Sequence, residues 1–207
     1  MTPPRSATHL IPRKQPAQPR SSRTVGVILE AAARILEEQG FDGYTTNSIA
    51  ERAGVSIGSL YQYYPGKDAI TIALIEQESA VLLDAMTKAA RMDEWANALR
   101  SMIRGATEHQ LTRPKLARLL DFEEARLPFP AHAVRVGSTI HSAIAEVLKK
   151  RLECSQEDVG VLAYDILAIT RGLTDSAGER GETDIEELER RVTRAVFGYL
   201  ERPQERL

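Results

Sequence analysis

The sequence contains a single cysteine, Cys154, in 207 residues. One thiol excludes a disulfide within the chain and agrees with a reducing compartment. We interpret Cys154 as a partly buried thiol at a helix end rather than as a redox sensor. No window approaches 18 uncharged apolar residues, the length that a membrane-spanning helix needs, and the N-terminus lacks the apolar stretch of a secretory signal. We therefore expect a cytoplasmic protein with no membrane partner.

Motifs for catalysis and metal binding are also missing. His109, His132 and His141 form no HExxH motif and no pair four residues apart, so a metal site is not expected. The chain has no glycine-rich phosphate loop and no GxSxG nucleophile turn. We expect neither an enzyme nor a resident cofactor.

The composition is that of an ordinary globular protein, with 43% hydrophobic and 27% charged residues. Its charge is unevenly distributed. Residues 1–68 hold eight Lys/Arg against six Asp/Glu, whereas residues 69–207 hold 19 against 23. A basic N-terminal part followed by an acidic remainder agrees with a nucleic-acid contact confined to the N-terminal part of the chain.

Apolar residues recur at helical spacing throughout the chain after Thr24, and no β-hairpin signal is present. The pattern predicts an all-α fold of about nine helices. Proline and glycine divide them, notably Gly40, Pro65-Gly66, Pro114 and Pro128. We expect three parts: an N-terminal arm (residues 1–22), a helix-turn-helix domain (residues 23–68) and a helical domain for effector binding and dimerisation (residues 69–207).

The N-terminal arm holds five of the ten prolines, four basic residues and no acidic residue, and a fifth basic residue, Arg23, follows it directly. Its composition is typical of a disordered segment. Two interpretations stay open for it. It either adds contacts to DNA phosphates or the minor groove, or it is a solvated leader without a role.

The stretch Thr45–Ile70 predicts two short helices joined by a tight turn, followed by a third helix. Thr45 is placed to cap the first helix, Gly54 to reverse the chain, and Ser56 to cap the second. Leu60 and Tyr64 would face inward, which leaves a short helix with exposed tyrosines and a glycine. Such a helix contributes little to a core, and the layout is that of a helix-turn-helix.

At these positions the chain resembles the tetracycline-repressor family of bacterial regulators. The resemblance covers residues 24–72, with matches at Ile28-Leu29, Ala31-Ala32, Ile35-Leu36, Gly40-Phe41, Thr46, Ile49-Ala50, Ala53-Gly54-Val55-Ser56, Gly58, Leu60-Tyr61, Tyr63-Tyr64 and Lys67. Two positions depart from the usual pattern. Ile57 stands where the family often has a polar or basic residue, and Tyr64 stands where phenylalanine is common.

The resemblance implies DNA contacts at ten positions: Thr46, Asn47, Ser56, Ile57, Gly58, Ser59, Tyr61, Gln62, Tyr63 and Lys67. Hydroxyls, amides and the lysine suit phosphates, whereas an apolar side chain or glutamine can meet base edges. The expected partner is a double-stranded, palindromic operator bound by a homodimer, with repression as the expected outcome. The alternative is a helical adaptor that uses the same hairpin against another protein.

The resemblance further implies a small-molecule effector in the C-terminal domain, apolar or amphipathic in character. The candidate lining residues are apolar ones from the middle of the chain, namely Trp95, Leu99, Met102, Leu119, Phe122 and Ile140. Plain core packing is the alternative for each. The wide apolar sector of the last two helices favours dimerisation through Leu162, Ile166, Ile169, Leu173, Val192 and Val196, or else the closing of the protomer's own core.

Overall fold

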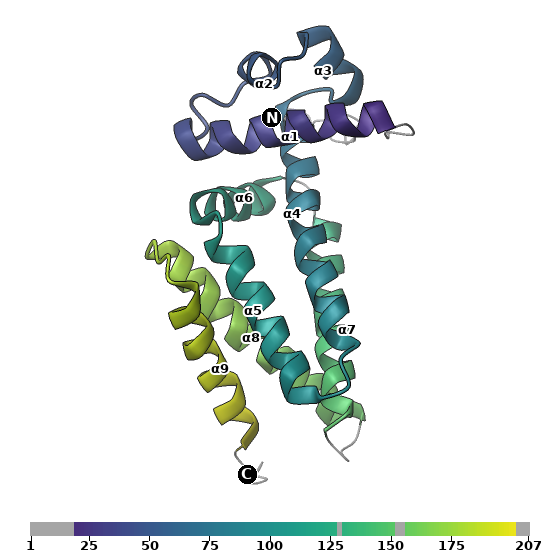
Figure 1. Cartoon of the computed structure of the whole chain (residues 1–207), viewed down its shortest axis with the longest axis vertical. Helices are drawn as coiled ribbons and strands as arrows, with labels where there is room; N and C mark the ends of the chain where they lie inside the picture. The colour runs from purple at the N-terminus through teal and green to yellow at the C-terminus, as the bar shows by residue number, and fades with distance from the viewer. Residues whose placement is uncertain (1–18, 128–129, 152–155, 202–207) are drawn as a thin grey trace, which may run out of the picture. The chain divides into compact units, whose positions relative to one another are not determined.

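The computed structural model describes residues 19–127, 130–151 and 156–201, and over these ranges every regular element is an α-helix (Figure 1). The predicted all-α class is confirmed. Cys154 and residues 1–18 of the N-terminal arm lie outside the described residues. None of the helices within the described ranges has the length and apolar character to cross a bilayer.

The chain divides into two compact units. The N-terminal unit contains the described residues up to Gln77 together with residues 119–127. The C-terminal unit contains residues 78–118 and the described residues from 131 onward. The division falls inside the fourth and sixth helices. The expected boundaries after residues 22 and 68 stay predictions.

The N-terminal unit is built from α1 (Pro19–Gln39), α2 (Thr46–Arg52), α3 (Ile57–Tyr63) and the first half of α4 (Lys67–Ala90). Helix α1 begins inside the segment assigned to the arm, because proline suits the first turn of a helix, where its missing N–H is not needed. One apolar face of each helix points inward. The largest fully buried side chains of this unit are Tyr44, Ile28, Ile35, Leu36, Ile49, Leu60, Ile70 and Leu74.

The turn between α2 and α3 follows the predicted chemistry. The Thr45 hydroxyl accepts the Ser48 backbone N–H at 3.1 Å and begins α2. After α2, Gly54 has φ +65°, a left-handed conformation in which a side chain is strained. The Ser56 hydroxyl then accepts the Ser59 backbone N–H at 3.1 Å and begins α3. These polar caps replace the hydrogen bonds that helices this short leave unmade at their ends.

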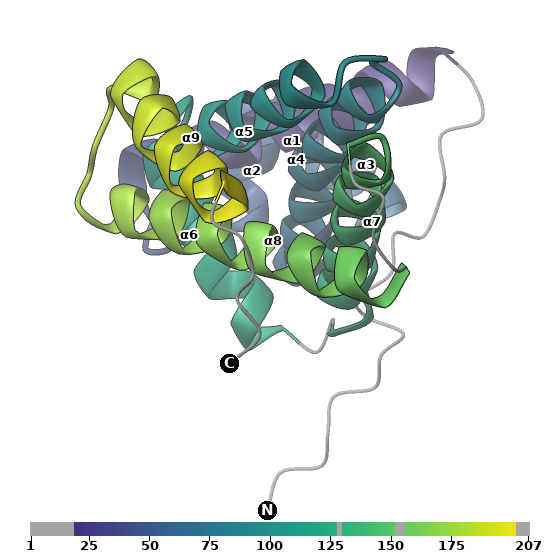
Figure 2. The same ribbon diagram turned by 90° about the horizontal axis from the view of Figure 1, so that it is seen from below.

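The C-terminal unit contains the second half of α4 together with α5 (Trp95–Leu111), the start of α6 (Pro114–Arg126), α7 (Pro130–Lys149), α8 (Gln156–Glu179) and α9 (Ile185–Glu201). Helices α5, α8 and α9 pack against one another (Figure 2). Their apolar faces meet around Leu99, Ile103, Ile166 and Val196. The Tyr199 hydroxyl of α9 donates a hydrogen bond of 2.5 Å to Asp165 of α8, and this bond, together with burial, raises the pKa of Tyr199 to about 12.

The residues proposed for the dimer seam serve largely in this core. Leu162, Ile166, Val192 and Val196 are buried within their own protomer, Ile166 to 1% exposure. Ile169 and Leu173 are partly buried against the same cluster. The buried apolar stripe of α8 thus packs against α5 and α9 of the same protomer. Burying these residues does not require a second protomer.

Substituting Gly54→Ala should lower the free energy of unfolding by about 1–2 kcal/mol, because alanine is strained at φ +65°. Urea unfolding followed by circular dichroism measures this. Gly58→Ala is the matched control, since a Cβ there meets only the Ser56 hydroxyl at 4.0 Å and alanine raises helix propensity. Equal stability of the Gly54→Ala protein and its parent would contradict the strained turn.

Candidate nucleic-acid interface

Helix α3 is anchored by one face and exposed on the other. Leu60 and Tyr64, four residues apart, are 0% and 2% exposed. Burial raises the pKa of the Tyr64 hydroxyl to about 12. The remaining side chains of the helix are exposed or half-buried, and they are Ile57, Ser59, Tyr61, Gln62 and Tyr63. A helix of seven residues that buries so little of itself presents a surface rather than a core.

The hydroxyl groups of α2 and α3 come together at one point. The Thr46 Oγ1 atom lies 3.1 Å from the Tyr61 hydroxyl oxygen, with either group able to donate. Thr46 is the first residue of α2, where backbone N–H groups are free to bind an anion, and Asn47 beside it is exposed. Two hydroxyls at hydrogen-bonding distance form a small polar patch that suits a phosphate oxygen.

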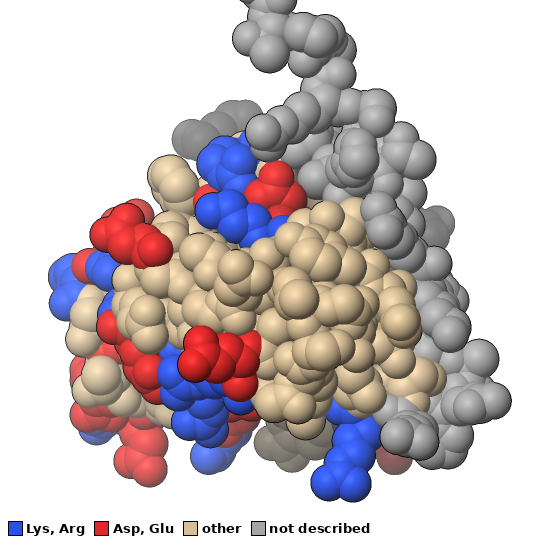
Figure 3. Space-filling view, turned by 90° about the horizontal axis from the view of Figure 1, so that it is seen from above, with Lys and Arg blue, Asp and Glu red and all other residues tan. Residues whose placement is uncertain are grey.

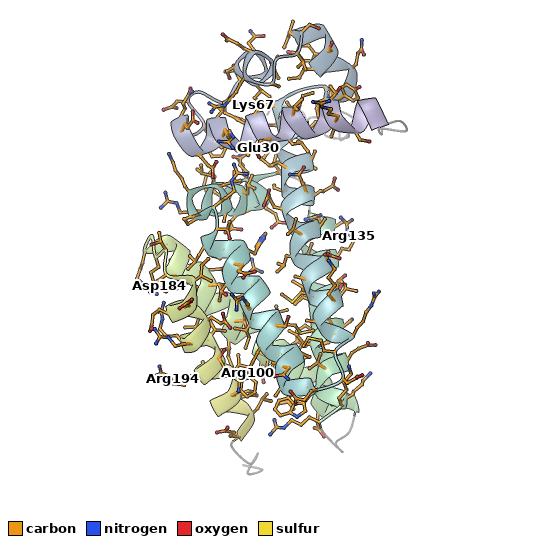
Figure 4. The ribbon with its side chains drawn as sticks, viewed as in Figure 1. Glu30, Lys67, Arg100, Arg135, Asp184 and Arg194 are labelled. Atoms are coloured by element: carbon orange, nitrogen blue, oxygen red, sulfur yellow. The ribbon has the colours of Figure 1, made fainter. Side chains whose placement is uncertain are left out.

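Lys67 begins α4 and is exposed (Figure 4). Its backbone carbonyl accepts a hydrogen bond of 3.0 Å from the Thr71 hydroxyl, and the Thr71 Oγ1 atom also lies 3.1 Å from the buried Tyr44 hydroxyl oxygen. Burial raises the pKa of Tyr44 above its usual value. The buried pair of Thr71 and Tyr44 therefore helps to fix the first turn of α4, which begins with Lys67.

A second polar cluster joins the end of α6 to the same turn of α4. Arg126 donates to both carboxylate oxygens of Glu123, at 2.8 and 2.5 Å, and to Asp68 at 3.3 Å. Glu123 is only 5% exposed, and its hydrogen bonds hold the pKa of Arg126 above the usual value. The sequence did not predict this cluster, because Asp68 and Arg126 are 58 residues apart and no local pattern links them.

The helix-turn-helix surface carries little free positive charge. Arg52 makes a two-pronged ion pair with Glu38, with both contacts at 2.5 Å, and the pair lowers the pKa of Glu38. Arg34 is paired with Glu30 at 2.8 Å. Figure 3 shows a broad area of neutral residues on this face, with charged residues gathered toward its margins.

The candidate effector residues fall into two groups. Leu99, Met102 and Ile140 are buried in the core of the C-terminal unit, whereas Leu119 and Phe122 belong to the N-terminal unit. Phe122 is 64% exposed, so its ring does not line an enclosed site. The sequence could not show this, since Phe122 has the apolar character of a core residue.

Trp95 is engaged in packing at the start of α5. Its indole stacks on Phe197 with ring centroids 5.7 Å apart, and the Arg151 guanidinium lies 4.6 Å from its centroid. Arg100 lies over the Phe197 ring at 4.4 Å (Figure 4). These contacts give Trp95 a structural role without any ligand.

The interior of the C-terminal unit also holds polar side chains that the sequence analysis did not select. Thr107, Gln110 and Thr174 are buried, and both threonines donate to carbonyls of their own helices. Gln110 packs on Gly178, where an added Cβ would lie 2.5 Å from the amide nitrogen. Burial lowers the pKa of the neighbouring His109. Among the described residues no group of three or more metal-ligating side chains gathers in one place.

An exposed two-turn recognition helix on a three-helix unit, followed by a helical C-terminal unit, defines a helix-turn-helix DNA-binding protein. Two sequence models match the chain: "Bacterial regulatory proteins, tetR family" over residues 28–74, and "Tetracyclin repressor-like, C-terminal domain" over residues 94–200. The chain belongs to the tetR family and is a DNA-binding transcriptional regulator. A helical adaptor that does not bind DNA is not favoured.

Curated relatives match part of the chain. It is similar to the nucleoid occlusion factor SlmA of Haemophilus influenzae (strain PittGG), with 32% identity over 96 residues, 44% of each chain. It is also similar to the transcriptional regulator RutR of Escherichia coli K12, with 37% identity over 97 residues, 46% of this chain and 45% of that one. The matched stretch thus spans less than half the length of these relatives.

Solved structures match nearly the whole fold. A fatty acid degradation regulator, FadR, from Bacillus halodurans has a TM-score of 0.70 at 18% identity, covering 91% of this chain and 100% of that one. A TetR-like regulator from Rhodococcus sp. RHA1 has a TM-score of 0.68 at 20% identity, covering 89% and 100%. At such low identity these two structures show the shared fold.

Replacing Arg126→Leu should lower the free energy of unfolding by about 1–3 kcal/mol, because the buried Glu123 carboxylate loses its partner. Thermal unfolding measures the effect. The double variant Glu123→Leu/Arg126→Leu should regain most of the loss, since no buried charge is left unpaired. An Arg126→Leu protein as stable as its parent would show that the cluster does not hold α6 to the first turn of α4.

Proposed function

We propose that this protein is a ligand-responsive repressor of the cytoplasm that binds a palindromic operator as a homodimer and is released by a small effector. The observation that carries the DNA-reading role is the exposed face of α3, whose opposite face is sealed by Leu60 and Tyr64. Two copies related by a two-fold axis would place two such helices in successive major grooves.

The contacts divide by chemistry. Thr46, Asn47 and Lys67 suit phosphates because they lie at helix N-termini. Tyr61 and Tyr63 can donate hydroxyls to the backbone, and Ser56 and Gly58 let α3 approach closely. Contacts to base edges are assigned to Ile57, Ser59 and Gln62, because glutamine pairs with adenine and an apolar side chain can contact a thymine methyl group.

The effector is assigned to the interior of the C-terminal unit. Leu99, Met102 and Ile140 supply apolar surface there, and Gln110 supplies a buried amide. An apolar or amphipathic molecule suits this mixture, because such sites combine apolar walls with few polar groups. Binding of the effector would alter the C-terminal unit, which contains parts of α4 and α6. The coupling free energy between effector binding and DNA binding would be about 1–3 kcal/mol.

Dimerisation is assigned to the exposed side of α8 rather than to its buried stripe. Val161 and Tyr164 are 55% and 61% exposed, and Ala168 and Gly172 continue the same row. Tyr164 is held in place by stacking on His141, with ring centroids 3.9 Å apart, and the His141 Nε2–H donates to the Gly160 carbonyl. Small residues beside an exposed aromatic ring allow a partner helix to come close.

Substituting Gln62→Ala should relax sequence preference at one base position by about 1–3 kcal/mol. Selection from a randomised operator library measures this directly. Lys67→Ala is the contrasting variant, because loss of a phosphate contact should weaken binding to all sequences and lower the salt slope by about 1. An unchanged operator motif with Gln62→Ala would rule out base reading by this side chain.

The variants Val161→Asp and Tyr164→Asp should each convert dimers to monomers, because the new charge would be desolvated at the interface. Light scattering coupled to size exclusion gives the mass. Val81→Asp, which alters a 64% exposed valine on α4, serves as the control and should remain dimeric. Ile166→Asp is unsuitable, since it places a charge in the protomer's own core. Dimer mass in both α8 variants would refute this seam.

A further inference from the structure

One buried polar side chain of the C-terminal unit has no hydrogen-bond partner. Among the described residues of this unit, Thr107 and Thr174 are buried and donate to carbonyls of their own helices at 2.9 and 3.1 Å. The buried ring of His132 lies 3.1 Å from the Ser79 hydroxyl. Gln110 is 7% exposed, and its amide makes no hydrogen bond within the described part of the chain. Most buried polar groups in proteins are paired, so this exception requires an explanation.

The Gln110 amide lies where α5 packs on α8 (Figure 2). A Cβ added at Gly178 of α8 would lie 2.5 Å from the amide nitrogen, so the missing side chain makes room for the amide. Among the described residues, Arg191 Nε is the one fully enclosed side-chain nitrogen or oxygen atom without a hydrogen bond. The unpaired amide atoms of Gln110 are therefore not fully enclosed, and a molecule the size of water can reach them. Convergent polar groups of this kind, set in apolar surroundings, are typical of small-molecule sites.

Two further hydrogen-bonding groups lie one turn away on the same helices. Thr107 precedes Gln110 by three residues on α5, and Thr174 precedes Gly178 by four residues on α8, spacings that place side chains on one helix face. Each threonine hydroxyl uses its proton within its own helix, but its oxygen keeps a lone pair that can accept. The glutamine amide can both donate and accept. The contact between α5 and α8 therefore offers several hydrogen bonds and no charge.

No charged residue is buried in the described part of the C-terminal unit. Arg191, whose Nε atom is enclosed, is paired with Glu182. The His132 Nδ1 atom lies 2.9 Å from the Arg135 guanidinium, which can only donate, so the imidazole accepts and is neutral. Burial lowers the pKa of His109, which keeps this ring neutral at pH 7 as well. A charged ligand group would find no opposite charge here, and burying it unpaired costs far more than burying a neutral polar group.

We propose that the effector carries an uncharged group of the amide type, and that the Gln110 amide binds this group beside Gly178. The proposal rests on the proposed function, because it gives the chemical class of the effector assigned there to the C-terminal unit. An amide ligand would exchange two hydrogen bonds with Gln110, since each amide has both a donor and an acceptor. The apolar remainder of the ligand would contact core residues such as Leu99 and Met102. Carboxylates and protonated amines are excluded as the buried group.

The test uses the full-length protein and three probes of equal chain length, namely octanamide, octanoate and octylamine. At pH 7 these probes are neutral, anionic and cationic. Isothermal titration calorimetry gives their dissociation constants, and fluorescence anisotropy with a selected operator duplex measures release from DNA. Gln110→Leu removes the amide at similar side-chain volume. Gln77→Leu is the matched control, because it makes the same change at an exposed glutamine of α4. Circular dichroism follows the thermal unfolding of both variants.

Octanamide should bind the parent protein at least about 10-fold more tightly than either charged probe, because only its head group can be buried without an opposite charge. Gln110→Leu should weaken octanamide binding about 10-fold through the lost hydrogen bonds, whereas Gln77→Leu should match the parent. The unliganded Gln110→Leu protein should be at least as stable as the parent, because an unpaired buried amide has been replaced by an apolar group.

Three results would each overturn the proposal: no binding of octanamide, equal affinity for octanamide and octanoate, or unchanged octanamide binding in Gln110→Leu. A Gln110→Leu protein that unfolds about 3 °C or more below the parent would overturn it too, since the amide would then serve the fold. Octanamide that binds without loosening the operator complex would support the ligand class and contradict release by an effector. A parent protein that binds no duplex would contradict the regulator assignment, and calorimetry would still decide the ligand class.

Discussion

The fixed position of α3 depends on the burial of Leu60 and Tyr64 and on its packing against α2. A helix of two turns is unstable alone, because its nucleation cost exceeds what a few hydrogen bonds return. Here the Ser56 cap and the left-handed Gly54 fix the N-terminal end of the helix, and the two inward side chains fix its buried face. The outward side chains contribute little to the core of the unit, which leaves their surface available to a partner.

The surface of this unit that we propose for DNA binding carries little free positive charge. Arg34 and Arg52, which would otherwise add positive charge, are committed to glutamates within the unit. Exposed pairs of this kind stabilise little, but they remove charge from the surface. Under the proposed function, discrimination then rests on shape and hydrogen bonding at α3.

The two units are connected through two helices rather than one. Helix α4 passes from one unit to the other near Gln77, and α6 does so near Arg118. The end of α6 is held within the N-terminal unit by Arg126, which bridges Glu123 and Asp68 beside Lys67. Any change in the C-terminal unit that moves α6 would therefore act on the turn that carries a proposed phosphate contact.

The sequence alone determined the helical class, most of the helix limits and the recognition turn, because these depend on local signals: apolar spacing, capping hydroxyls, and glycine at a reversal. Only the tertiary structure decided which apolar residues are buried and which remain available. Ile166 and Tyr164 lie on one helix with similar apolar character, yet the first is sealed by α5 and α9 and the second is exposed. The same holds for the exposed Phe122, and for Arg126 and Asp68, which lie far apart in sequence. Packing between segments far apart in the sequence decides which of these residues are buried and which charged residues form pairs. No local sequence pattern encodes that packing.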